Sequence, residues 1–196
     1  MIDPNDPNYR PKDNRMLGVG LCAAAALLLI YACVSHRWLE NSQFKGARFG
    51  FSLLSFEGCM GKECESKSNF AVMAEVKKHS PDMASSAFAP MGIVTLGLLG
   101  IAALALLATA AIGYQKKRPA LKLPPTTIAL LAIMAGLITG CIFIATKPGG
   151  VGGVGVGLAF WAFGIGAVMG IAGAQMLNKH IKPIDPDLPD PASSAY

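Results

Sequence analysis

Residues Pro90–Tyr114 read PMGIVTLGLLGIAALALLATAAIGY, a run of 25 residues without one Asp, Glu, Lys, Arg or His. About 20 such residues cross the roughly 30 Å hydrocarbon core of a bilayer as a helix. Three further windows share this character: Met16–Ser35, Leu123–Thr146 and Gly149–Leu177. Backbone groups in lipid must be satisfied within the protein, and apolar runs of this length lack the alternation of barrel strands. We therefore expect four transmembrane helices.

The composition of the whole chain agrees with this expectation. Of 196 residues, 53% are hydrophobic and 15% are charged, whereas a soluble domain carries about 25% charge. A disordered chain would be highly charged and poor in aliphatic residues, so that class is excluded. A soluble enzyme with one modest core is excluded as well. The predicted fold class is an all-α membrane protein, a bundle of four transmembrane helices.

The cations between and beyond the spans predict the orientation. The loop between the second and third spans holds Lys116, Lys117, Arg118 and Lys122, and the N-terminal tail holds Arg10, Lys12 and Arg15. By the positive-inside rule these segments are cytoplasmic, although seven Lys or Arg in the first loop oppose this orientation. The first span resembles a secretory signal, but its apolar run is too long for a signal core, which favours a retained helix.

The predicted organisation has nine segments in a plasma membrane or a bacterial inner membrane. They are a cytoplasmic N-terminal tail (1–15), the first span (16–35), an extracytoplasmic loop (36–89), the second span (90–114), a basic cytoplasmic loop (115–122), the third span (123–146), a short outer turn (147–148), the fourth span (149–177) and a cytoplasmic tail rich in Asp and Pro (178–196).

The long first loop has recognisable local patterns. Phe49, Phe51 and Leu53 alternate with polar or small residues, and this period of two predicts a strand within 47–56 with one buried face. Apolar residues at near-helical spacing predict a short amphipathic helix over 69–79, with Asn69 as its cap. The loop should therefore form a small, partly β-structured unit.

Two of the five cysteines, Cys59 and Cys64, stand close together in this loop. On an oxidising side of the membrane they can close a small loop as a disulfide. A metal pair is the rival interpretation, with His79 nearby, although the spacing is unusual for one. The other three, Cys22, Cys33 and Cys141, lie in predicted spans, where cysteine is usually a small packing residue.

The layout resembles the claudin and peripheral-myelin-protein group of four-span membrane proteins. In that group the first outer loop carries a Trp, then Gly-Leu-Trp, then a cysteine pair that forms a disulfide. Trp38 matches the early Trp by position, Phe56-Glu57-Gly58 is similar to the run leading into Gly-Leu-Trp, and Cys59 and Cys64 match the pair. This sequence departs from the pattern because no Leu-Trp follows Gly58 and the cysteines are closer together.

Small residues recur every four positions in the last two predicted spans. The repeats are Ala132, Gly136 and Gly140 in the third span, and Gly149, Gly153 and Gly157, then Gly166, Gly170 and Ala174, in the fourth. Such spacing lets helix backbones approach closely. The favoured interpretation is packing within the chain's own bundle. A groove for another subunit is the second interpretation, and a re-entrant segment over 149–157 is the third.

The predicted spans lack the side chains that catalysis, ion transport or cofactor binding would require. They contain no ionisable residue of the kind that ion pumps and proton relays require. His36, His79 and His180 lie at or beyond span ends, where they cannot clamp a haem inside the bundle. No protease, hydrolase or phosphate-loop motif is present. We expect no enzymatic activity, cofactor, metal, nucleic acid or small-molecule substrate.

The predicted function is that of an accessory or assembly subunit of a larger membrane complex, or of a self-associating scaffold. Its partners are the lipid bilayer and either other membrane subunits or further copies of this chain. Trp38, Phe49 and Phe51 are the candidate contact residues of the outer loop. The alternatives are a claudin-like adhesion or barrier protein, and a channel or carrier for a small neutral or lipidic solute.

Overall fold

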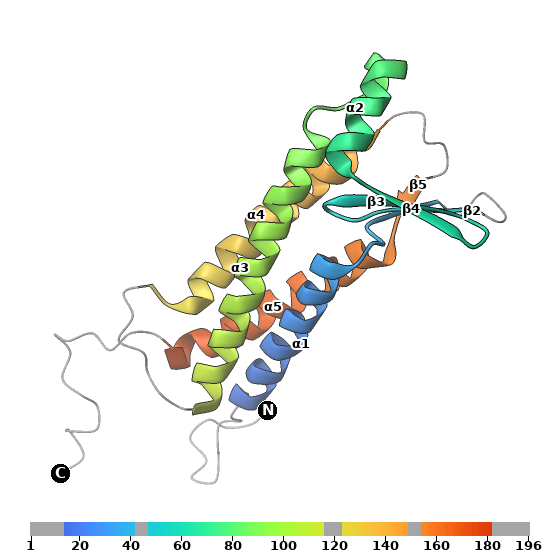
Figure 1. Ribbon diagram of the computed structural model, residues 1–196. Coiled ribbons are helices and arrows are strands. Elements are labelled where there is room, and N and C mark those ends of the chain that lie inside the picture. The colour runs from blue at the N-terminus through green and yellow to red at the C-terminus, as the bar shows by residue number, and fades with distance from the viewer. Residues whose placement is uncertain (1–13, 42–46, 116–122, 149–153, 182–196) are drawn as a thin grey trace, which may run out of the picture.

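The protein is built around four helices long and apolar enough to span a membrane (Figure 1). The computed structural model describes residues 14–41, 47–115, 123–148 and 154–181. The four helices are α1 (Arg15–Val34), α3 (Phe88–Gln115), α4 (Pro125–Ala145) and α5 (Leu158–Ile181). At 1.5 Å per residue, even the shortest reaches about 30 Å, the thickness of a bilayer core. The prediction of a multi-pass, four-span membrane protein is confirmed.

The helices form one bundle in which α1 packs against both α3 and α5, and α3 packs against α4. Small side chains fill much of the interior, including Cys22, Ala25 and Ala26 on α1. The outward faces are equally apolar, because Leu104, Leu131 and Val168 are all well exposed. A helix that is hydrophobic on every side belongs in a protein core or a membrane, which fits helices that meet each other inside and lipid outside.

The second and third spans match their predicted positions, but the fourth helix begins later than predicted. We expected a span over 149–177, and α5 starts only at Leu158. Before it, Val154–Val156 forms strand β5, so the connection after α4 is longer than the two-residue turn predicted at 147–148. An uncharged Gly/Val sequence suits a span and a buried strand equally well, and here pairing with another strand satisfies its backbone.

The remaining described elements form a cap at one end of the bundle (Figure 1). The cap consists of an antiparallel sheet of order β4-β3-β2-β1-β5, the helix α2 (Asn69–His79) and a short 3-10 turn (Pro81–Met83). The other strands are β1 (Leu39–Asn41), β2 (Ala47–Phe51), β3 (Ser55–Met60) and β4 (Glu63–Ser68). The single strand predicted within 47–56 is thus two strands, β2 and the start of β3, joined by a turn.

The helix predicted over 69–79 is confirmed, but its predicted cap is wrong. The side chain of Ser68, not that of Asn69, accepts the hydrogen bond from the Ala71 N–H. Asn69 is buried, and its Nδ2 donates to the carbonyl oxygens of Ser52 and Leu53, each at 3.1 Å. Because these carbonyls belong to the turn between β2 and β3, Asn69 ties α2 to that turn.

Candidate functional site

The cap is anchored to the bundle by Trp38. This side chain is 0% exposed, and its ring centroid lies 5.7 Å from that of Phe163 and 6.0 Å from that of Phe143. Its Nε1 donates a 2.6 Å hydrogen bond to the carbonyl oxygen of Ala32, near the end of α1. An indole that is buried and satisfied in this way fixes the start of the cap relative to three helices.

Two of the three aromatic residues expected to make outer-loop contacts are buried within the chain itself. Trp38 contacts the helices, and Phe51 packs against Phe88 with ring centroids 5.5 Å apart. Phe49 is half-buried, and its ring stacks on that of Phe56. Trp38 and Phe51 therefore hold the cap in place and present no ring to a partner.

Two glycines allow the backbones of the cap and the helices to approach closely. A Cβ at Gly92, near the start of α3, would collide with the carbonyl oxygen of Leu53 in the β2–β3 turn. A Cβ at Gly157, just before α5, would collide with the carbonyl oxygen of Arg37. The predicted role of Gly157 as part of a helical packing stripe is thus wrong, because it lies before the helix; Gly149 and Gly153 lie outside the described residues.

The other predicted small residues pack inside the bundle. Ala132 is buried, and a Cβ at Gly136 would lie 3.1 Å from Leu99 of α3. The corresponding neighbours are Phe163 for Gly140, Leu28 for Gly166 and both Ile133 and Leu106 for Gly170. All of these neighbours belong to the chain's own helices. The structure therefore favours internal packing over a groove for another subunit at these positions.

One face of the cap's sheet is polar and hollowed. Residues directly opposite each other on neighbouring strands place their side chains on the same face, which groups Glu40 with Gly50 and Glu57, and Arg48 with Cys59 and Cys64. Apart from Cys64, these residues border, together with His36 and Arg37, an open hollow of about 600 Å³. The opposite face carries Leu39, Phe51 and Phe56, the side that packs against the bundle. We call the first face the charged face.

The ionisable side chains of the cap differ in their pairing. Arg37 Nη2 donates to Glu40 Oε2 at 3.0 Å, and this hydrogen bond and the carboxylate charge raise the pKa of Arg37. Lys67 pairs with Glu75 at 3.1 Å and with Glu65 at 3.3 Å, which raises the pKa of Lys67. Exposed pairs of this kind contribute little stability. Within the described residues, Arg48 and Glu57 have no ion-pair partner.

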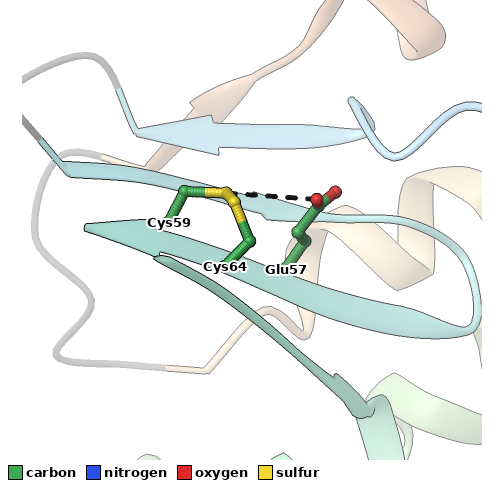
Figure 2. A group of neighbouring side chains, drawn as sticks. All are labelled: Glu57, Cys59 and Cys64. Carbon is green, nitrogen blue, oxygen red and sulfur yellow. Dashed lines mark hydrogen bonds between the residues drawn. A yellow bond between two sulfur atoms is a disulfide. The ribbon is translucent and has the colours of Figure 1, made fainter. Parts of the chain in front are cut away.

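The predicted disulfide between Cys59 and Cys64 is present and lies on the charged face (Figure 2). The two cysteines are register partners on β3 and β4, with Cα atoms 4.0 Å apart. Glu57 is on the same strand and the same face as Cys59, and its Oε1 lies 4.0 Å from Cys59 Sγ. Cys59 is half-buried and Cys64 is exposed.

Inside the bundle, two buried threonines of α3 have hydrogen-bond partners, whereas Thr126 Oγ1 of α4 has none among the described residues. Thr95 of α3 donates to Thr139 Oγ1 of α4 at 3.0 Å, and Thr109 donates to the carbonyl oxygen of Ala105 at 2.8 Å. These bonds tie helices together or stay within one helix. The charged face is thus the most distinctive polar feature of the described residues. Sequence alternation pointed to a two-faced strand, but it could not reveal which charges share a face.

No protein-family model matches the chain, and no curated protein matches it.

Proposed function

We propose that this protein is a non-catalytic, self-associating membrane scaffold whose cap pairs with the cap of a second copy along the free edge of strand β4. The observation that carries the proposal is that β4 ends the sheet on that side and that its side chains are largely exposed. A strand in this position presents unpaired N–H and C=O groups that form a template for another strand.

The backbone geometry indicates which residues of β4 present those groups. In an antiparallel pair, opposed residues about 4.5 Å apart do not hydrogen-bond each other, whereas those about 5.5 Å apart do. The Cα separation of 4.0 Å at Cys59 and Cys64 marks the first kind. The N–H and C=O groups of Cys64, and by alternation those of Ser66, therefore point away from β3. Ser66 lies at the centre of the free edge.

The charges along β4 favour one register between two copies. Antiparallel pairing centred on Ser66 places Glu65 of each copy opposite Lys67 of the other, twice, as twofold symmetry requires. A shift by one residue toward the N-terminus would place Glu65 opposite Glu65 and be disfavoured. The same alternation of charge discourages pairing with unrelated strands.

The cap is proposed to lie on the extracytoplasmic side, with both termini in the cytoplasm. The disulfide supports this side, because such bonds persist in oxidising compartments. The basic residues of segment 115–122 support it too, because α3, which precedes them in the sequence, ends at Gln115 at the end of the bundle remote from the cap.

A claudin-like adhesion or barrier function is the second candidate. It is supported by a Trp after the first span that anchors the loop and by a closed cysteine pair in that loop. The chain lacks Leu-Trp after Gly58, which weighs against direct transfer of that group's activity. Reconstituted vesicles separate the candidates, because adhesion clusters vesicles and association within one membrane does not.

Ser66→Pro tests the proposed interface. Proline removes the outward N–H of Ser66 and is tolerated on an edge strand whose N–H faces solvent. We expect the wild-type protein in mild detergent to have the native mass of two copies, and Ser66→Pro that of one. Ser66→Ala keeps the N–H and should remain a dimer.

The disulfide provides the check on folding for this experiment. Ser66→Pro should retain the Cys59–Cys64 bond, measured by the absence of thiol labelling at these two positions. A monomeric wild type would contradict self-association. A Ser66→Pro protein that keeps the wild-type mass would exclude β4 as the contact.

A further inference from the structure

We infer that Cys59, Cys64 and Glu57 form a Zn²⁺ site when the disulfide is reduced, so that the charged face has two alternative states, one cross-linked and one metal-bound. This inference does not depend on whether two caps associate. The potential ligand atoms of these three residues, two sulfurs and a carboxylate oxygen, all lie within 4.8 Å of one another. Figure 2 shows the Glu57 carboxylate directed toward the sulfurs from the same strand as Cys59.

The spacing of these atoms suits tetrahedral zinc. Bonds of about 2.3 Å to sulfur and about 2.0 Å to oxygen place ligand atoms roughly 3.5–3.8 Å apart in a tetrahedron. Glu57 Oε1 is already 4.0 Å from Cys59 Sγ. The two sulfurs must separate and the carboxylate must approach them by a few tenths of an ångström or more, which side-chain rotation achieves once the disulfide is broken. A fourth coordination position remains for water.

The contact between Glu57 and Cys59 acquires a clear role only in the reduced state. A disulfide sulfur carries no hydrogen, so the carboxylate cannot accept a hydrogen bond from it. After reduction, the Cys59 thiol can donate to Glu57 Oε1. When both thiols have lost their protons, the same oxygen and the two sulfurs face a common point.

The neighbouring charge favours a divalent cation. Two thiolates and one carboxylate carry a charge of −3, and Zn²⁺ brings the site to −1. Arg48 is the register partner of Cys59 on the same face and has no ion-pair partner within the described residues. Its guanidinium balances the remaining charge, and a cation beside a cysteine favours the thiolate form that binds metal.

The hairpin should retain its shape without the disulfide. Hydrogen bonds along the β3–β4 ladder hold the strands, and Gly61 forms the turn with a φ of 64°. The cross-link closes only a short loop between residues already paired by this ladder. The three ligands therefore remain on adjacent positions of one sheet face.

A small dithiol can serve as the reductant that converts the Cys59–Cys64 disulfide into two thiols. One thiolate of the dithiol attacks Sγ of Cys64, the more exposed of the two residues, and Cys59 leaves as a thiolate and takes up a proton. The second thiol of the reductant then displaces Cys64, which yields a cyclic disulfide and two protein thiols. Binding of Zn²⁺ releases both thiol protons. Reoxidation by a disulfide compound reverses the sequence and expels the metal.

The test uses the full-length protein in detergent, reduced with a dithiol that is then removed under nitrogen. We expect reduced protein to bind one Zn²⁺ per chain, measured by competition with a chromophoric chelator. Co²⁺ in its place should give a thiolate-to-metal charge-transfer band. Oxidised protein and the Cys59→Ser/Cys64→Ser variant should bind none, and this variant keeps the three helix cysteines as an internal control.

Glu57→Gln should weaken Zn²⁺ binding to the reduced protein by about tenfold or more, because it removes an anionic ligand. Glu63→Gln is the matched control, because Glu63 is adjacent to Cys64 but on the opposite face. The Zn²⁺ affinity of the reduced Glu63→Gln protein should equal that of wild type. Equal binding by oxidised and reduced protein, or equal affinity of Glu57→Gln and wild type, would overturn the site. Circular dichroism that showed loss of the sheet on reduction would overturn it as well.

Discussion

Replacing Trp38 with Ala is expected to lower the thermal midpoint of the detergent-solubilised protein by roughly 10 °C. Truncating a buried Trp typically costs about 3–5 kcal/mol, and each kcal/mol corresponds to about 2–4 °C in a chain of this size. The indole contacts Phe143 and Phe163 and bonds the Ala32 carbonyl, so its loss releases the cap from three helices at once.

The chain's other tryptophan is the matched control for this prediction. Trp161 is 62% exposed on the lipid-facing side of α5, whereas Trp38 is 0% exposed. Trp161→Ala should shift the midpoint by no more than a few degrees. Trp38→Phe, which keeps a ring but not the donor, should fall between the two. Equal shifts for Trp38→Ala and Trp161→Ala would show that Trp38 does not anchor the cap.

The second large loss of thermal stability is expected from substitution of Gly92, where the turn between β2 and β3 lies against α3. Gly92→Ala places a methyl group on the Leu53 carbonyl oxygen, a backbone atom that cannot move aside without shifting the turn. Overpacking of this kind costs about 1–3 kcal/mol, and we expect a midpoint several degrees below wild type.

Gly97→Ala on the same helix provides the control, because nothing lies within 4 Å of a Cβ there. Alanine is the better helix former by up to about 1 kcal/mol, so this variant should be unchanged or slightly more stable. A loss of stability in Gly92→Ala without a loss in Gly97→Ala would separate the effect of close backbone approach from that of helix propensity. A Gly92→Ala protein as stable as Gly97→Ala would disprove tight seating of the turn.

The sequence predicted the parts of the fold that depend on local pattern. Uncharged length identified the four helices, and near-helical spacing placed α2 at its observed ends. It did not predict β5, because Val154–Val156 is as uncharged as a span, and its strand character depends on pairing with β1, which is more than 100 residues earlier. Asn69 was misassigned as a cap because only the fold brings the β2–β3 turn to its side chain.

The candidate site was predictable in part. The proximity of the two cysteines suggested a cross-link, and a metal pair was considered with His79 as the nearby ligand. The third potential ligand is instead Glu57, two residues before Cys59, which alternation along β3 places on the same face. Arg48 joins this group only through the β2–β3 register, which depends on long-range pairing and is absent from any local pattern.

The most direct test of association through β4 is cross-linking of a Ser66→Cys protein in its membrane. Pairing centred on residue 66 places the two new cysteines opposite each other, with Cα atoms about 5.5 Å apart, within the range of a disulfide. Lys62→Cys at the hairpin tip would lie roughly 27 Å from its counterpart. We predict that mild oxidation yields a covalent dimer of Ser66→Cys and none of Lys62→Cys. Failure of Ser66→Cys to cross-link, or equal cross-linking of both, would contradict the proposed interface.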